Sequence, residues 1–217
     1  MSKPDSTLFE TSTLHDAARR LGLEVGLDAV MPLAPGMRLQ GLAYTVRFGP
    51  VDATPSAPLN FYDVIAHAPK GSVLVVQVGM ARWVCGANMS RFAQLSGMAG
   101  MVLDGCVRDV AAIRTRGYPM FARGVAVRSY ADALAMQAVH GGIDCGGIHI
   151  ESGDVIVGDD DGVVALPASR LEDILYEADQ IAMLDRKLAA DIEGRRPLPE
   201  LHATRLQWSV RRTAAKP

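Results

Sequence analysis

The sequence predicts a mixed α/β fold in which helices and strands first alternate and short strands then follow one another. Two observations carry this prediction. From about residue 12 to residue 122, segments with helical spacing of apolar residues alternate with runs rich in β-branched residues. The later segment HIESGDVIVGDDDGVVALP instead joins strand patterns through turn residues. This order favours mixed layers over a purely doubly wound sheet.

The elements of the first half divide at turn residues such as Gly22, Gly49-Pro50 and Pro69-Lys70-Gly71. The patterns predict, in order, a helix, a strand, a loop (DATPSAP), a short helix and a strand at residues 12–21, 37–48, 52–58, 61–66 and 72–78. The last of these is an almost continuous β-branched run, which is typical of a central strand buried on both faces.

The second half continues the alternation. A loop is bracketed by Gly79 and Gly86, and a short buried strand is expected to close at Asp104-Gly105. Beyond the loop, the patterns predict a helix, the buried strand, a helix, a strand and a long C-terminal helix at residues 88–95, 101–103, 108–116, 119–122 and 168–192.

Composition limits the class of protein. The chain has 217 residues, 49% apolar and 21% charged, which suits one sizeable core. We expect a single domain over residues 1–217, extended by an N-terminal helix and a C-terminal helix or tail. The net charge of −2 argues against a nucleic-acid partner, and no apolar run approaches the roughly 20 residues that cross a membrane. Three widely spaced cysteines and the lack of a secretory signal suit the cytoplasm.

The loop before residues 88–95 is a candidate anion site. Gly86 stands at the opening of that helix, followed by the small Ala87 and then Asn88. Exposed N–H groups at a helix start bind anions when a glycine lets the ligand approach. The alternative interpretation is a glycine that is needed only for a tight turn.

The segment DGCVRD is the second candidate. The residues after the buried strand emerge at its carboxyl end, where open α/β sheets usually bind ligands. Arg108 can make a two-pronged contact with a carboxylate, and Asp109 offers a hard oxygen ligand for Mg²⁺ or Mn²⁺. The alternative is that Asp109 caps its own helix while Arg108 pairs with it or with Asp104.

Other polar groups are less informative. The run Asp159-Asp160-Asp161-Gly162 lacks the spacing of a calcium loop and predicts a solvated hairpin turn. The five histidines are isolated from one another and from the cysteines in sequence, so we assign them no catalytic role. The motifs of a nucleophile elbow, a phosphate loop and a dinucleotide or methyl-donor site are missing.

Two segments resemble a known family. GANMSRFAQLSGMAGMVLDGCVRDVAAIRTRGYPMFARG and SGDVIVGDDDGVVALP are similar to the RraA-like family, which is named after the regulator of ribonuclease activity A and contains the 4-hydroxy-4-methyl-2-oxoglutarate aldolases. The resemblance covers about residues 69–167. It implies a three-layer β/β/α swivelling-domain fold, assembled as a homotrimer or homohexamer with sites near subunit contacts.

The aldolase branch of the family implies roles for both candidates. The residues expected to bind the pyruvate part of an oxoacid share one loop, Gly86, Ala87, Asn88 and Met89. Arg108 is expected to contact the substrate and Asp109 to hold the divalent metal, Mg²⁺ or Mn²⁺, which makes this pair the expected catalytic residues. A bound cation stabilises the pyruvate enolate that both aldol cleavage and oxaloacetate decarboxylation produce.

One position departs from the aldolases. They carry an acidic residue where this chain has Ala87. If that acid moves the proton of the substrate hydroxyl, its loss lowers aldol cleavage more than decarboxylation, which needs no hydroxyl deprotonation. The family also implies an acid from a neighbouring subunit's C-terminal region, for which Asp185 and Glu193 are the candidates.

These observations leave two hypotheses. The first is a metal-dependent carbon–carbon lyase acting on short oxo-dicarboxylic acids, which the presence of both Arg108 and Asp109 favours. The second is a non-catalytic regulatory binding protein like the ribonuclease E inhibitor, which the loss of the acid at Ala87 favours.

Overall fold

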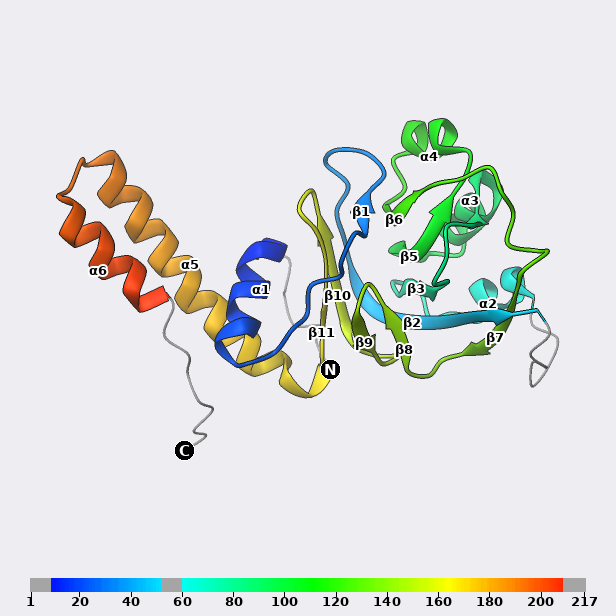
Figure 1. Cartoon of the computed structure of the whole chain (residues 1–217), viewed down its shortest axis with the longest axis horizontal. Coiled ribbons are helices and arrows are strands. Elements are labelled where there is room, and N and C mark those ends of the chain that lie inside the picture. Colours follow the sequence, from blue (N-terminus) through cyan, green and yellow to red (C-terminus); the bar gives the residue numbers. More distant parts are fainter. Residues whose placement is uncertain (1–8, 52–59, 209–217) are drawn as a thin grey trace. The chain divides into compact units, whose positions relative to one another are not determined.

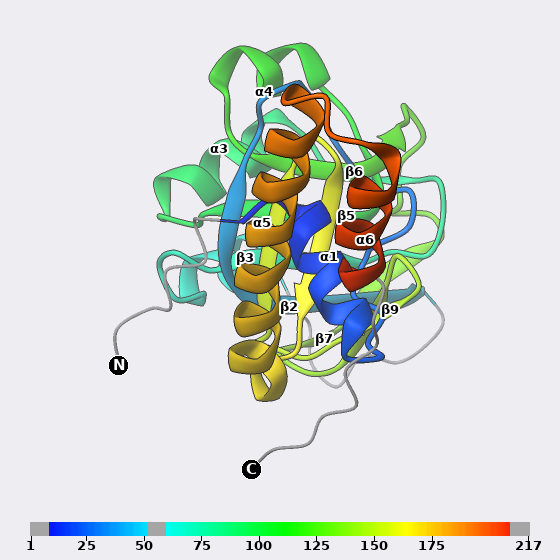
Figure 2. The same ribbon diagram turned by 90° about the vertical axis from the view of Figure 1, so that its left-hand side faces the viewer.

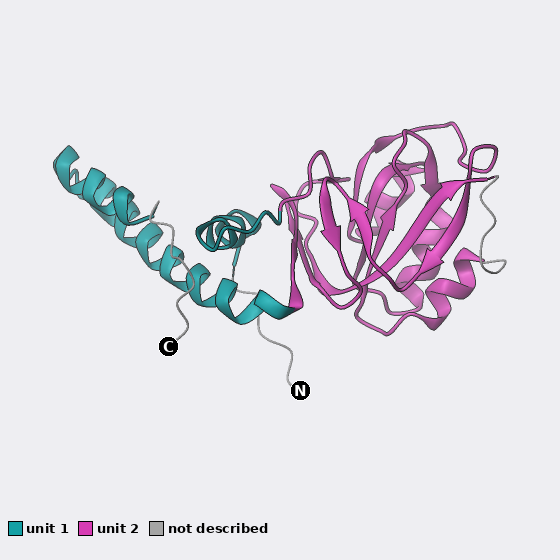
Figure 3. Ribbon diagram, turned by 60° about the horizontal axis from the view of Figure 1, so that its bottom comes forward, with its two compact units in different colours: residues 1–25, 169–217 teal, residues 26–168 magenta. Residues whose placement is uncertain are grey.

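The computed structural model describes residues 9–51 and 60–208 and divides into two compact units (Figure 3). Residues 26–168 form the sheet unit, and residues 1–25 together with 169–217 form the helical unit. The predicted loop at residues 52–58 lies outside the described residues.

Within its described residues, the sheet unit contains a nine-stranded mixed sheet with the order β1-β6-β5-β3-β2-β10-β11; β4 pairs with β5, and β7 pairs with β2 (Figure 1). The pairs β2·β3, β3·β5, β4·β5 and β5·β6 are parallel, and the other pairs are antiparallel. The strands of this sheet are β1 (Met31–Pro32), β2 (Leu39–Pro50), β3 (Val73–Gln77), β4 (Trp83–Cys85), β5 (Gly100–Val107), β6 (Met120–Val125), β7 (Leu134–Val139), β10 (Val155–Asp159) and β11 (Gly162–Leu166).

Three short helices lie together on one side of this sheet, away from β10 and β11 (Figure 1). They are α2 (Phe61–His67), α3 (Ala87–Leu95) and α4 (Val110–Arg116). A separate antiparallel hairpin, β8 (Ile143–Cys145) and β9 (Ile148–Ile150), contacts β3 through β8. The predicted strand at residues 72–78 is confirmed as the central β3, in which Val73 to Val76 are completely buried. The mixed α/β prediction is thus confirmed.

The strand β5 is longer than the sequence predicted. Asp104 and Gly105 do not close it but lie inside it, and all eight of its residues are buried. Asp104 is tolerated there because it pairs with Arg123 of β6. Gly105 is needed because an added Cβ would lie 2.7 Å from the Cβ of Val78. The glycine therefore marks a close approach within the core, not the end of a strand.

Other predicted elements agree with the structure to within a few residues. The loop between Gly79 and Gly86 was a wrong prediction, since it contains β4, whose three residues are too few to show a period. The strand β7 and the helix α6 (Leu198–Trp208) were not predicted. The Asp159–Gly162 turn is confirmed as the tip of the β10–β11 hairpin.

The helical unit contains α1 (Thr11–Arg20), α5 (Leu171–Glu193) and α6, and the 3₁₀ turn η2 (Ala168–Arg170) starts at the last residue of the sheet unit. Both α1 and α6 lie against α5 (Figures 1 and 2). The guanidinium of Arg20 ties all three together: its Nη1 lies 3.0 Å from Oε2 of Glu177, and its other nitrogens donate to the backbone carbonyls of Gln207 and Trp208. A search of the described helices finds none with the length and apolarity to cross a membrane.

Candidate functional site

The two candidate segments meet at the carboxyl ends of β4 and β5. These strands are parallel neighbours, so the residues that follow them emerge at the same edge of the sheet. The backbone N–H of Arg108 donates to the carbonyl of Cys85 over 3.0 Å, which places Arg108 beside Gly86. The structure therefore brings the glycine loop and the Arg108-Asp109 pair together, as the family resemblance implied.

Asp109 has a left-handed backbone, with φ 60° and ψ 34°. It occupies the N-cap position of α4, but its side chain makes no capping bond to that helix. Its Oδ2 instead accepts the backbone N–H of Ala87, the first residue of α3, over 3.1 Å. The carboxylate thus lies at the N-terminus of α3, where helix amides and the helix dipole favour negative charge.

Arg108 lies beside this carboxylate. Its Nε is 3.6 Å from Oδ2 of Asp109, and its Cζ lies 3.7 Å from the centroid of the Trp83 ring. The alternative pairing with Asp104 does not occur, because Asp104 is paired with Arg123. The side chains of Arg108 and Asp109 are 49% and 45% exposed, so both can reach a small molecule from solvent.

Gly86 is required by close approach. Its φ of −143° and ψ of −165° are extended values open to any residue, so a turn does not explain it. An added Cβ would lie 2.6 Å from Oδ2 of Asp109 and 3.1 Å from Cγ of Arg108. Because Gly86 has no side chain, the Asp109 carboxylate and the Arg108 side chain can lie next to the start of α3.

The remaining loop residues belong to the first turn of α3. Asn88 is exposed, whereas Ala87 and Met89 are partly buried and Met89 packs against the core. The first N–H groups of a helix have no partner inside it, so this turn can offer donors to an anion. Cys85 lies buried behind the loop, and burial raises the pKa of its thiol to about 12, which makes it a poor nucleophile.

The C-terminal acids lie on α5 in the helical unit. Burial and the neighbouring Asp16 of α1 raise the pKa of the Asp185 carboxyl. Glu193 ends α5 and is exposed. The described residues contain no group of three or more histidine, cysteine or acidic side chains that could hold a metal. Within this site, Asp109 supplies the carboxylate oxygens that could ligate a cation.

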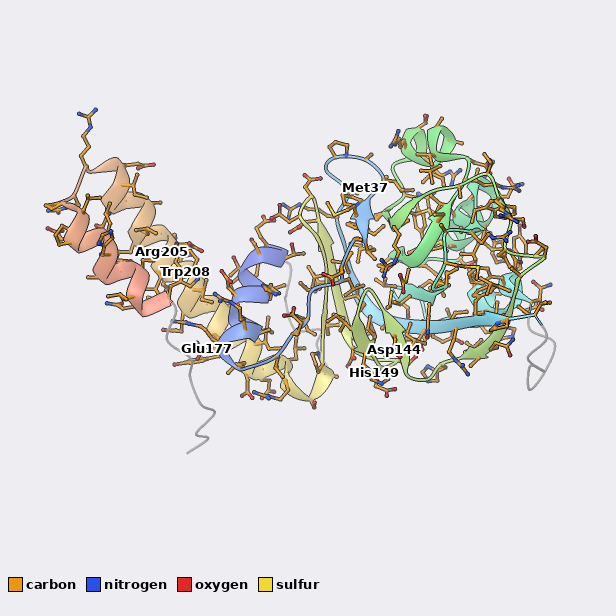
Figure 4. The ribbon with its side chains drawn as sticks, in the orientation of Figure 1. Met37, Asp144, His149, Glu177, Arg205 and Trp208 are labelled. Carbon is orange, nitrogen blue, oxygen red and sulfur yellow. The ribbon has the colours of Figure 1, made fainter. Side chains whose placement is uncertain are left out.

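A polar cluster on the β8–β9 hairpin was not predicted from the sequence. His149 on β9 lies between two carboxylates, with Nδ1 2.9 Å from Asp144 and Nε2 3.1 Å from Glu151. Figure 4 shows Asp144 and His149 together at the hairpin. These hydrogen bonds raise the pKa of the imidazole. Alternation along β9, which puts residues 149 and 151 on one face, was the available signal.

Comparison with known proteins assigns the family. The sequence model of the RraA-like family, described as Aldolase/RraA, matches residues 11–165. The chain belongs to this family. The RraA-like protein is 30% identical over 187 residues, 85% of this chain and 82% of the relative, to a Halalkalibacterium halodurans protein named "Putative 4-hydroxy-4-methyl-2-oxoglutarate aldolase". It is also 30% identical over 186 residues to Protein DlpA of Legionella pneumophila, covering 84% of this chain but only 30% of DlpA.

A solved structure supports the fold assignment. The RraA-like protein matches Streptomyces coelicolor RraAS2, described as an unusual member of the RNase ES inhibitor RraA protein family. The TM-score is 0.74 at 27% identity, over 85% of this chain and 99% of the other. The expected RraA-like fold is therefore confirmed. Names of both an aldolase and a ribonuclease inhibitor occur among the relatives.

Proposed function

We propose that this RraA-like protein is a divalent-metal-dependent lyase that cleaves short oxo-dicarboxylic acids through a pyruvate enolate. The observation that carries the proposal is the meeting of three groups around Gly86: the N-terminus of α3, the guanidinium of Arg108 and the carboxylate of Asp109. A carboxylate next to a carbonyl needs such donors, and a hard cation needs such an oxygen.

Each group of the site has its own role in the proposed reaction. The first-turn amides of α3 and Arg108 hold the carboxylate of the pyruvate part and orient the adjacent carbonyl. Asp109 and water suit Mg²⁺ or Mn²⁺, because Mg²⁺ usually keeps several waters and binds through one or two carboxylates. When bound, the cation supplies Lewis-acid stabilisation of the developing enolate charge. Arg108 keeps the charge of Asp109 balanced before substrate arrives.

The deciding experiment measures pyruvate release from oxaloacetate and from 4-hydroxy-4-methyl-2-oxoglutarate by the purified protein with Mg²⁺ or Mn²⁺. Free metal ions also decarboxylate oxaloacetate, so the same metal without protein is the blank. Turnover above this blank of either substrate supports the lyase. Failure to turn over both substrates, with the fold intact, favours the regulatory binding protein, for which Ala87 and the similarity to RraAS2 speak.

Ala87 leads to the first prediction within this proposal. The side chain of the first α3 residue starts beside the Asp109 carboxylate, because the Ala87 amide donates to it. Ala87→Asp should raise aldol cleavage by about tenfold while decarboxylation stays within about twofold, since only the former needs a base for the hydroxyl. Parallel kcat/KM measurements on both substrates check this. Equal changes in both reactions would assign position 87 to substrate binding instead.

A second prediction concerns the space at Gly86, which Gly86→Ala would fill. The new methyl group would displace the Asp109 and Arg108 side chains without disturbing the extended backbone. We expect kcat/KM to fall about tenfold, because small displacements of catalytic groups are costly. Gly141→Ala is the matched control, since nothing lies within 4 Å of its added Cβ. Unaltered activity in Gly86→Ala would show that the space at Gly86 is not used.

We also propose that the chain acts as one domain with helical extensions, in a cytoplasmic homotrimer or homohexamer. The family match at residues 11–165 spans parts of both units, which supports the single domain. Half-exposed Arg108 and Asp109 leave room for a neighbouring subunit to complete the site with Asp185 or Glu193.

A further inference from the structure

Trp83 carries the guanidinium of Arg108 on its face. The Cζ of Arg108 lies 3.7 Å from the centroid of the ring, within the range of a cation–π contact. Arg108 is otherwise a long side chain that is half exposed, and its Nε lies 3.6 Å from Oδ2 of Asp109. A flexible arginine pays conformational entropy when it binds a ligand. A stacking surface removes part of that cost in advance.

The indole is itself held in place. Its Nε1 donates to the carbonyl of Val127 over 3.0 Å, and the backbone N–H of Trp83 donates to the carbonyl of Arg128 over 3.1 Å. The same residue pairs with Cys106 of β5 on its other side. Trp83 is thus fixed by β5 and by the segment that follows β6.

A series of aromatic ring contacts links Trp83 to the core. Tyr130 meets the Trp83 ring edge to face at 6.0 Å, and Phe48 meets Tyr130 in the same way at 5.3 Å. Phe48 is 5% exposed and packs edge to face on Phe61 of α2. Such pairs favour defined ring orientations. The Trp83 ring, which these contacts connect to the core, is therefore the ring that faces the Arg108 guanidinium.

We infer that Trp83 is the positioning residue of the oxoacid site, holding Arg108 in the orientation that receives the substrate carboxylate. This inference rests on the proposed function. Trp83 does not touch the reacting atoms, and its contribution is to binding. Because binding of the carboxylate persists from substrate to transition state, losing Trp83 raises KM and leaves kcat nearly unchanged.

The kinetic test compares Trp83→Leu and Trp83→Phe with the unmodified protein. Trp83→Leu should raise KM for oxaloacetate about two- to fivefold, the effect of a cation–π contact at an exposed site. Trp83→Phe keeps an aromatic face but loses the N–H, so its KM should lie between the other two. Trp208→Phe, which replaces the other tryptophan, is the control and should leave KM unchanged.

A second readout needs no turnover. In Trp208→Phe protein, Trp83 is the sole tryptophan, and its quenching by acrylamide reports the exposure of the indole face. Adding Arg108→Ala should increase this quenching, because the guanidinium no longer covers the ring. Saturating pyruvate with Mg²⁺ should decrease it in protein that retains Arg108.

The outcomes separate the two proposals. Unchanged quenching in the Arg108→Ala protein, or unchanged KM in Trp83→Leu while the unmodified protein turns over, overturns the role of Trp83 and leaves the lyase standing. A fall in kcat with constant KM also overturns it. If the unmodified protein turns over neither substrate and pyruvate does not change the quenching of the Trp208→Phe protein, the lyase proposal fails and this inference fails with it.

Discussion

Asp109→Asn should lower kcat/KM by about 10²- to 10³-fold for both oxaloacetate and 4-hydroxy-4-methyl-2-oxoglutarate, the scale of losing one preorganised electrostatic group. The amide is neutral and a far weaker ligand for Mg²⁺ or Mn²⁺ than the carboxylate is. The change is otherwise small, because asparagine tolerates the left-handed backbone of position 109 and still offers an oxygen to the Ala87 amide. Pyruvate release at several metal concentrations measures it.

Two further variants make this result specific. Asp109→Ala should be less stable than Asp109→Asn, since alanine adopts φ 60° at a cost and leaves the α3 amide without its acceptor. Asp161→Asn removes an exposed aspartate at the β10–β11 turn and should keep full activity. Activity that survives in Asp109→Asn would sink the metal assignment, and equal losses in Asp161→Asn would point to a general effect of charge.

Much of the sheet unit could be predicted from sequence, because its buried strands are long and β-branched. The helix and strand alternation, the central position of residues 73–77 and the β10–β11 turn all follow from local patterns. The predicted strand at residues 101–103 was shorter than β5, because Asp104 and Gly105 are poor strand residues. Only the partners Arg123 and Val78, which lie elsewhere in the sequence, explain their presence inside it.

The candidate site was predictable in part. Gly86 and Arg108 were expected in one site because the family resemblance implies it, whereas the parallel pairing of β4 with β5 that brings them together was not predicted. The sequence could not tell that Asp109 turns away from α4 to reach the Ala87 amide, since capping is the common fate of such an aspartate. Trp83 went unnoticed as well, because its contact joins a residue of β4 to Arg108, which follows β5 and lies 25 positions further along the sequence.

The largest stability effect is expected in the helical unit. Arg20 and Glu177 form a buried pair, with side chains 8% and 4% exposed. Arg20→Met should lower the unfolding free energy of this unit by about 3–5 kcal/mol, because it removes the guanidinium that lies beside the buried Glu177 carboxylate. The carbonyls of Gln207 and Trp208 also lose their donor. Hydrogen exchange of amides in α1, α5 and α6, compared with amides in β5, measures the effect.

The double variant Arg20→Met/Glu177→Leu tests the cause. Replacing both members of a buried ion pair by apolar residues is often neutral or stabilising. The protection of the amides should therefore return to within about 1 kcal/mol of its original value, and the remaining loss comes from the carbonyl groups of α6 that no longer have the Arg20 donor. Arg19→Met is the matched control on α1: its side chain is 60% exposed and its pair with Asp16 is worth at most about 1 kcal/mol. If the double variant is as unstable as Arg20→Met, the cost lies in the α6 carbonyl groups rather than in the Glu177 carboxylate. Because the guanidinium of Arg20 donates to the carbonyl groups of Gln207 and Trp208 at the end of α6, amide exchange should then increase in α6 before it increases in α5.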